Sequence, residues 1–176
     1  MKFKNIIIQM LCLLMLETAC VSNSSTNVVK AQDNAVAVNP EEVFNGEKIK
    51  KSDAGWKTQL DAEAYQVLRQ KGTERAFTAQ EMLKSKKKGV YCCAACGLPL
   101  FSSDTKFNSG TGWPSFWDVA AKQNVGSITD ESHGMERVEV VCNRCDGHLG
   151  HVFDDGPEPT GLRYCINGAA LKFVEK

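Results

Sequence analysis

The sequence predicts a mainly β domain of antiparallel strands, preceded by short helices. From Gly89 onward, short apolar runs are separated by Gly, Pro, Asn and Asp, the residues typical of turns. No helix-length segment separates these runs, so we expect antiparallel strands rather than parallel strands joined by crossover helices. Two helical patterns lie before the first run, and the folded part is long enough to bury one core.

The helices are expected between residues 60 and 85. In "LDAEAYQVLRQKG" (60–72), apolar residues recur at helical spacing and Gly72 can end the helix. In "TAQEMLKS" (78–85), Thr78 precedes Glu81 by three residues, which is a capping-box pattern.

The strands are expected in six short runs. In "RVEVV", alternation points Val138 and Val140 to one side and Arg137 and Glu139 to the other. The runs are residues 89–93, 98–101, 125–128, 137–142, 151–153 and 163–166.

The N-terminus predicts export. Lys2 and Lys4 precede an apolar stretch, residues 6–16, which is too short to span a bilayer but typical of a signal peptide. We assign residues 1–19 to that peptide. The following "LETAC" resembles the processing site of bacterial lipoproteins, which predicts a lipid anchor at Cys20 in the bacterial envelope. Cleavage by an ordinary signal peptidase, giving a periplasmic or secreted protein, is the alternative.

Residues 20–44 are rich in Ser, Asn, Thr and small side chains and show no sustained apolar periodicity. Such a composition predicts a flexible tether. The folded domain is therefore expected to span residues 45–176, with membrane contact only through the N-terminal anchor.

The charges argue against a nucleic-acid partner. The chain has 21 basic and 21 acidic residues, for a formal net charge of zero, so no strong field favours nucleic acid or an anionic membrane. The basic run "KSKKKG" (84–89) is interpreted as a solvated loop.

Two C-x2-C pairs, Cys93 with Cys96 and Cys142 with Cys145, predict a metal site. Four thiolates suit tetrahedral Zn²⁺ in a structural site that would tie distant strands together. Two disulfides, an iron site or a thioredoxin-type redox pair are the alternatives. Cys92, next to Cys93, leaves open which cysteine of this pair would bind the metal.

Two of the three histidines, His148 and His151, lie in "HLGHVF". They could be further metal ligands, but the four cysteines already complete a tetrahedral set. In a regular strand the two would face opposite sides. A bulge or turn at Gly150 would bring both rings to one pocket.

Cys165 is the one cysteine near the C-terminus, in "GLRYCING". As a strand, this segment places Arg163, Cys165 and Asn167 on one polar face, with Tyr164 and Ile166 on the other. A guanidinium beside Cys165 is expected to favour the thiolate and make it a nucleophile. An inert, half-buried cysteine is the alternative.

The aromatic residues of "SGTGWPSFWD" could form the wall of a pocket for a small apolar ligand, or could simply close the core. They are Trp113, Phe116 and Trp117.

Taken together, "YCCAACGLPLF", "KFNSGTGWPSFWD", "CNRCDGHLGHVFDDGP" and "LRYCINGAAL" resemble the B-type methionine sulfoxide reductases in order and composition. The resemblance covers roughly residues 50 to 174. It implies two antiparallel sheets with peripheral helices and an optional structural zinc on the four cysteines. It also implies thiol-dependent reduction of methionine-R-sulfoxide, free or within oxidised proteins, without an organic cofactor.

The resemblance also implies site residues. Cys165 matches the catalytic cysteine, and Trp113 matches the tryptophan whose indole receives the methyl group of the substrate. The polar residues of the active site match His148, His151 and Asn167. Phe153, Arg163 and Asp155 are the supporting candidates. By this chemistry, His151, or His148 through water, would protonate the departing oxygen.

Many members of that family carry a resolving cysteine where this chain has Thr111. Regeneration of Cys165 would therefore need another thiol, either Cys92 or an external thioredoxin-like or small-molecule reductant. We expect a monomer. The alternative functions are a zinc-stabilised β module for binding, without catalysis, and a thiol–disulfide exchanger that uses one C-x2-C pair.

Overall fold

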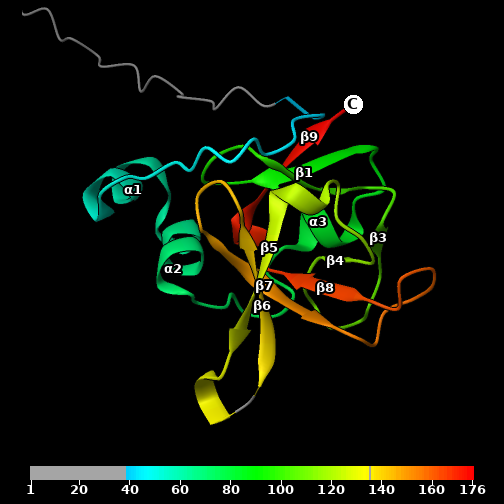
Figure 1. Ribbon diagram of the computed structural model, residues 1–176. Coiled ribbons are helices and arrows are strands. Elements are labelled where there is room, and N and C mark those ends of the chain that lie inside the picture. The colour runs from blue at the N-terminus through cyan, green and yellow to red at the C-terminus, as the bar shows by residue number, and fades with distance from the viewer. Residues whose placement is uncertain (1–38, 135) are drawn as a thin grey trace, which may run out of the picture. The chain divides into compact units, whose positions relative to one another are not determined.

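The computed structural model describes residues 39–134 and 136–176, and these contain three α-helices, three short 3-10 helices and nine strands (Figure 1). The α-helices are α1 (Asp53–Gln59), α2 (Ala62–Gln70) and α3 (Gln80–Lys84). The strands are β1 (Gly89–Cys93), β2 (Pro99–Ser102), β3 (Lys106–Phe107), β4 (Ser115–Phe116), β5 (Val125–Asp130), β6 (Arg137–Cys142), β7 (His148–Phe153), β8 (Arg163–Ile166) and β9 (Leu171–Glu175). The 3-10 helices are η1 (Lys122–Asn124), η2 (Ser132–Gly134) and η3 (Gly168–Ala170).

The strands form two antiparallel sheets, which confirms the predicted fold class. The smaller sheet has the order β2-β1-β9 and the larger has the order β3-β4-β8-β7-β6-β5. The larger sheet runs mostly through neighbouring strands, whereas β1 pairs with β9, the last strand in the sequence. In Figure 1 the β5–β6 hairpin extends away from the rest of the larger sheet and carries η2 at its tip.

Helix α2 occupies the predicted segment and is capped at both ends. The side chain of Asp61 accepts a hydrogen bond from the Ala64 amide at the N-terminus. At the C-terminus, Lys71 adopts a left-handed conformation with φ of 56°. The expected end at Gly72 is thus shifted by one residue, and Gly72 instead donates its amide to the carbonyl of Gln66.

The other two helices differ from the sequence expectation. Helix α1 is not predicted by apolar periodicity; it buries a single large side chain, Trp56. The capping box predicted for Thr78 is wrong, because α3 begins after Ala79 and has no side-chain cap. The Thr78 hydroxyl instead donates to the carbonyl of Arg75, as part of the preceding turn.

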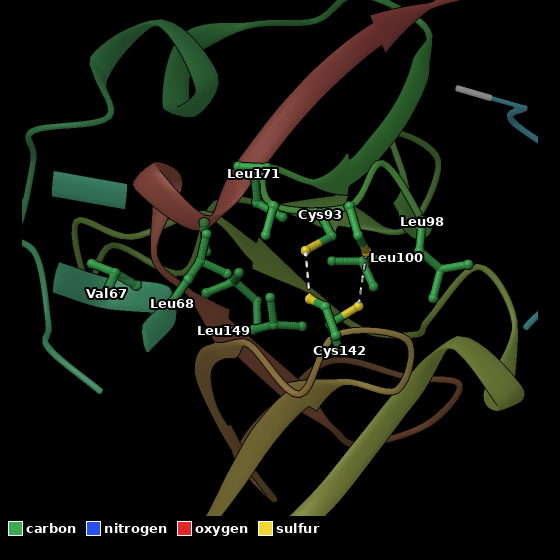
Figure 2. Packing of buried hydrophobic residues seen from close by; sticks show 14 of the residues in the cluster. Val67, Leu68, Cys93, Leu98, Leu100, Cys142, Leu149 and Leu171 are labelled. Atoms are coloured by element: carbon green, nitrogen blue, oxygen red, sulfur yellow. Dashed lines mark hydrogen bonds between the residues drawn. The ribbon is translucent and has the colours of Figure 1, made fainter. Parts of the chain in front are cut away.

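The two sheets pack against each other through aromatic side chains. Phe101 of the smaller sheet stacks on Phe116 of the larger, with ring centroids 4.5 Å apart, and also contacts Tyr164 at 5.7 Å. Tyr91 meets Phe116 edge to face at 5.0 Å. Figure 2 shows a neighbouring part of the core, where α2, β9 and the cysteine-bearing loops converge.

Part of the predicted tether belongs to the folded domain. The amide of Phe44 donates to Asn124 Oδ1 at 2.7 Å, and Asn124 Nδ2 donates to the carbonyl of Glu42 at 2.8 Å. The carboxylate of Glu42 also pairs with Arg144. Residues 42 and 44 of the predicted tether therefore contact the domain that is predicted to begin at residue 45.

The predicted signal peptide (1–19), the lipid anchor at Cys20 and most of the tether lie outside the described residues. Within residues 39–134 and 136–176, no helix has the length and apolar character needed to cross a membrane.

Candidate active site

Cys165 lies in β8, between two strands that bring polar side chains to it. β8 pairs with β4 on one side and with β7 on the other, and the register places Ser115 and His151 opposite Cys165. Side chains of such cross-strand partners share one face of the sheet, with Cβ atoms roughly 5 Å apart. Strand pairing therefore sets the distance between His151 and Cys165.

The two faces of β8 are as the alternation predicts. Ile166 is fully buried and Tyr164 packs against Phe101 in the core. Cys165 lies on the opposite face and is partly exposed. The predicted separation into an apolar and a polar face is confirmed.

A β-bulge in β7 brings the two histidines together. Leu149 is the extra residue in the pairing of β7 with β6. As a result the rings of His148 and His151 lie on the same side, with centroids 5.4 Å apart and planes inclined at 65°. Gly150 allows β8 to approach closely, since a Cβ at this position would lie 2.1 Å from the carbonyl oxygen of Cys165.

Cys165 opens into a small cleft with a volume of about 150 Å³. Five of the predicted site residues line it: Trp113, His151, Phe153, Cys165 and Asn167. The remaining lining residues are Thr73, Arg137 and Gly150. The residues that line the cleft thus come from five separate segments of the sequence.

Arg163 favours the thiolate of Cys165, as the sequence predicts, but burial has the larger effect on the pKa of the resting thiol. Burial raises its pKa above the ordinary value, whereas the hydroxyl of Thr111 and the guanidinium of Arg163 lower it by less. Thr111 Oγ1 lies 4.0 Å from the sulfur. Desolvation of the thiolate outweighs its attraction to the nearby cation.

Arg163 is held at the rim of the cleft by two partners. It donates two hydrogen bonds to Asp155, at 2.7 and 2.8 Å, in a bidentate ion pair. Its guanidinium carbon also lies 4.3 Å from the centroid of the Phe153 ring. Because its charge is shared with Asp155, Arg163 stabilises a thiolate at Cys165 less than a free guanidinium would.

His151 is oriented by a carboxylate. Its Nε2 lies 2.8 Å from Asp130 Oδ2, and the same oxygen accepts a hydrogen bond from Arg137 at 2.7 Å. Hydrogen bonds from Ser132 and from His151 hold the pKa of Asp130 well below its usual range. An ionised Asp130 accepts, so His151 donates from Nε2 and the proton-free position of its neutral ring is Nδ1.

His148 lies behind His151 and does not line the cleft. It is 3% exposed, and its Nδ1 lies 2.8 Å from Glu139 Oε1. Lys71 donates to the other oxygen of Glu139 at 2.7 Å. Burial lowers the pKa of His148 in spite of Glu139, so His148 is kept neutral and supports its neighbour.

Trp113 and Asn167 are fixed by the backbone of Glu74. The indole Nε1 of Trp113 donates to the Glu74 carbonyl at 3.1 Å, and the amide of Glu74 donates to Asn167 Oδ1 at 3.0 Å. Asn167 Nδ2 donates to the carbonyl of Leu149 at 2.9 Å. The buried carboxylate of Glu74 accepts from the amides of residues 168 and 169, and burial raises its pKa.

The four cysteines of the C-x2-C pairs converge in one buried cluster, whose sulfurs all lie within 4.8 Å of one another. Cys93 and Cys145 are 3.7 Å apart, and Cys96 and Cys142 are 3.5 Å apart (Figure 2). Sulfurs bound to Zn²⁺ at about 2.3 Å would lie roughly 3.8 Å apart in a tetrahedron. The cluster is therefore compatible with a structural zinc ion.

The two C-x2-C pairs also connect the two sheets. Cys93 ends β1 of the smaller sheet and Cys142 ends β6 of the larger. Hydrogen bonding among the four sulfurs raises the pKa of Cys93 and of Cys142 above the ordinary value, and a bound divalent cation would favour their thiolates.

Cys92 and Trp117 stand apart from the cleft. Cys92 is fully buried in the smaller sheet, and burial raises the pKa of its thiol to about 11. Of the aromatic group, Trp113 lines the cleft, whereas Phe116 is buried in the core and Trp117 is half-buried. Trp113 therefore forms part of the wall of a pocket, whereas Phe116 closes the core, so each of the two expectations holds for a different residue.

Sequence reasoning missed several residues that support the site. They are Thr73, Glu74, Asp130, Arg137 and Glu139. The sequence does show that Arg137 and Glu139 of "RVEVV" share one face of their strand. The residues that these two side chains contact could not be inferred, because the contacts depend on the register between β5, β6 and β7.

Comparison with known proteins identifies the family. The model of the SelR domain matches residues 60–175. The chain is 60% identical over 129 residues to the peptide methionine sulfoxide reductase MsrB of Leptospira interrogans, which covers 73% of this chain and 98% of the relative. The chain belongs to the B-type methionine sulfoxide reductases. Proteins of the same name from Methanosarcina mazei (60% over 129 residues, 73% of this chain and 91% of the relative) and Thiobacillus denitrificans (58% over 126 residues, 72% and 95%) agree with this.

The sequence-based identification of a B-type methionine sulfoxide reductase is thus confirmed, as is its class, an oxidoreductase. In this reductase, Thr111 lies against the sulfur of Cys165. A cysteine at position 111 would face the same atom, which accounts structurally for the resolving position noted in the sequence.

Proposed function

We propose that this protein reduces methionine-R-sulfoxide to methionine through Cys165, and so repairs oxidised proteins. Membership of the family supports the reaction, and the cross-strand pairing of Cys165 with His151 in the cleft supports the residues. The oxygen passes from the methionine sulfur to Cys165, which becomes a sulfenic acid while the substrate is reduced.

The thiolate of Cys165 attacks the sulfoxide sulfur and forms a sulfur–sulfur bond, while a proton is transferred to the sulfoxide oxygen. The hydroxyl then passes to the Cys165 sulfur as the sulfur–sulfur bond breaks, which releases methionine and leaves the sulfenic acid. His151 is the proposed acid, since it lines the cleft opposite Cys165. Because Asp130 engages Nε2, His151 would carry the transferred proton on Nδ1.

Trp113 is proposed to receive the methyl group of the substrate. Its ring lines the cleft, and the hydrogen bond from Nε1 to Glu74 fixes its plane. Asn167 holds β7 and the Glu74 segment in place, since both ends of its amide are engaged. Arg163, with Asp155 and Phe153, forms the rim.

Regeneration is proposed to use an external thiol. One thiol converts the sulfenic acid to a mixed disulfide with loss of water, and a second releases Cys165 with formation of a disulfide between the two. Cys92 is disfavoured as the resolving residue, because it is buried in the other sheet and its pKa is raised to about 11. A thioredoxin-like protein fits this role.

Zinc is proposed as the occupant of the cysteine cluster, in a structural role. The fit of the sulfur positions and their complete burial support it. When bound, the ion would hold Cys93, Cys96, Cys142 and Cys145 as thiolates and tie the two sheets together, without taking part in catalysis.

The export signal and the anchor at Cys20 stay proposals, supported by the sequence of residues 1–20 alone. A Cys20→Ala variant would test them: mass spectrometry of the N-terminal peptide should find the lipid on the wild type only. A monomer is likewise proposed, and light scattering tests it.

The test of the activity is an assay of the separate R and S epimers with dithiothreitol as reductant. We expect turnover of the R epimer only and none for Cys165→Ser. Turnover that survives this substitution, or preference for the S epimer, would contradict the proposal. The rival binding module is disfavoured because Cys165 faces His151 in a cleft rather than apolar side chains.

A further inference from the structure

A groove with a volume of about 630 Å³ lies beside the catalytic cleft, whose own volume is about 150 Å³. We call this groove the lysine groove. Most of its lining residues come from α3 and the segment that follows it and from the segment that runs from β3 to β4. Its lining includes five lysines: Lys84, Lys86, Lys87, Lys88 and Lys106.

Trp113 connects the lysine groove to the catalytic cleft. It lines both cavities, together with Cys165 on one side and Phe107 on the other. The groove is therefore continuous with the cleft at Trp113, where it could receive the polypeptide on one side of a methionine sulfoxide bound at Cys165.

The charge of the groove is strongly positive. No acidic residue lines it. Lys87 pairs with Glu175 and Lys88 with Asp104 outside the lining. Lys106 donates to two backbone carbonyls at the end of α3.

Two lysines stay available for a ligand. Lys84 and Lys86 are exposed and, among the residues that the structure describes, neither forms an ion pair. Their charges act on whatever occupies the groove, because lysine side chains reach several ångströms from the backbone.

An aromatic side chain also borders the groove. Phe77 is 56% exposed and adopts a left-handed backbone conformation with φ of 67°. Its amide donates to the carbonyl of Gly112 at 2.7 Å, which fixes this conformation. An exposed phenylalanine held in an unfavourable conformation is typical of a binding surface rather than of a core.

We propose that the lysine groove binds the polypeptide on one side of the methionine sulfoxide and selects substrates with acidic residues there. The inference rests on the proposed function. It identifies the preferred substrate class as oxidised methionines in acidic segments of proteins. The basic run that the sequence analysis treated as a solvated loop thereby acquires a role in specificity.

The test compares three peptides that contain methionine-R-sulfoxide flanked by Asp and Glu, by Ser and Gly, or by Lys, together with free methionine-R-sulfoxide. At low salt, kcat/KM should be at least about fivefold higher for the acidic peptide than for the lysine peptide, mainly through KM. The difference should shrink toward one at high salt.

Variants then locate the effect. Lys84→Glu combined with Lys86→Glu should abolish or reverse the acidic preference and leave the reduction of free methionine sulfoxide unchanged. Lys50→Glu combined with Lys122→Glu is the matched control, since both lysines are exposed and lie outside the groove; it should keep the preference. Equal use of all peptides, or a preference that the groove variant retains, would overturn the inference. A failure to reduce free methionine sulfoxide would instead contradict the proposed function.

Discussion

A single oxygen atom of Asp130, Oδ2, lies 2.8 Å from His151 Nε2 and accepts a hydrogen bond from Arg137 at 2.7 Å. Asp130 therefore fixes the ring orientation of His151 and stabilises its protonated form. We expect Asp130→Asn to lower kcat by roughly 10- to 100-fold, since a positioned acid contributes about 10²- to 10⁴-fold and a misplaced one only part of this.

A conservative replacement distinguishes this role from a structural one. Asp130→Glu keeps a carboxylate that can accept the hydrogen bond from His151, so it should retain more of the wild-type kcat than Asp130→Asn does. Glu131→Gln, at the exposed neighbouring position, is the control and should leave kcat unchanged. An Asp130→Asn enzyme with the kinetics of the wild type would disprove the role.

Position 111 determines how Cys165 is regenerated. Because Thr111 Oγ1 is 4.0 Å from the sulfur, Thr111→Cys should place a second thiol against the sulfenic acid. After one turnover without reductant, mass spectrometry should find a disulfide between residues 111 and 165 in this variant. The wild type and Thr111→Ser should instead retain a sulfenic acid that dimedone traps. A disulfide between Cys92 and Cys165 in the wild type would show internal recycling and contradict the external route.

The raised pKa of Cys165 predicts its reactivity. Burial disfavours the thiolate, so the rate of alkylation by iodoacetamide should keep rising through pH 9. Arg163→Met removes a cation that stabilises the thiolate and should shift the profile to higher pH. Asp155→Asn removes an opposing negative charge and should shift it to lower pH. Shifts of the same sign in both variants would show that the effect is structural rather than electrostatic.

Loss of one cysteine ligand should destabilise the domain. Cys96→Ser is expected to release the metal and to lower the free energy of unfolding by more than about 4 kcal/mol, measured by urea denaturation with metal analysis. Cys92→Ala is the control: it removes a buried sulfur next to the cluster and should retain one equivalent of zinc. A wild-type domain without bound zinc would rule out the assignment of the metal.

The sequence predicted the faces of β8, because alternation is a local signal. Gly150 indicated a bulge or turn between the two histidines, and the structure has the bulge at the neighbouring Leu149. It did not predict that Asp130 and Arg137 would orient His151. Those contacts depend on which residues face each other across β5, β6 and β7. Register is set by the packing of the complete sheet and not by any single segment.

The raised pKa of Cys165 was not predictable for a different reason. The neighbouring Arg163 was visible in the sequence, but the degree of burial and the bidentate bond from Arg163 to Asp155 were not. Both reduce the stability of the thiolate. Likewise, Thr78 had the pattern of a capping residue but bonds to the preceding turn, since several hydrogen-bonding arrangements were open to its hydroxyl.

Exposure differs among the six cysteines that the structure describes: five are buried and Cys165 alone is partly exposed. A peroxide that reaches the folded domain therefore meets Cys165 first. It would convert this thiolate to a sulfenic acid and water, and this sulfenic acid is the same species that turnover produces. The thiol that completes the catalytic cycle would then also reverse damage to the enzyme. Among the described cysteines, the burial pattern thus directs oxidative attack to the one whose sulfenic acid the external thiol of the catalytic cycle would reduce.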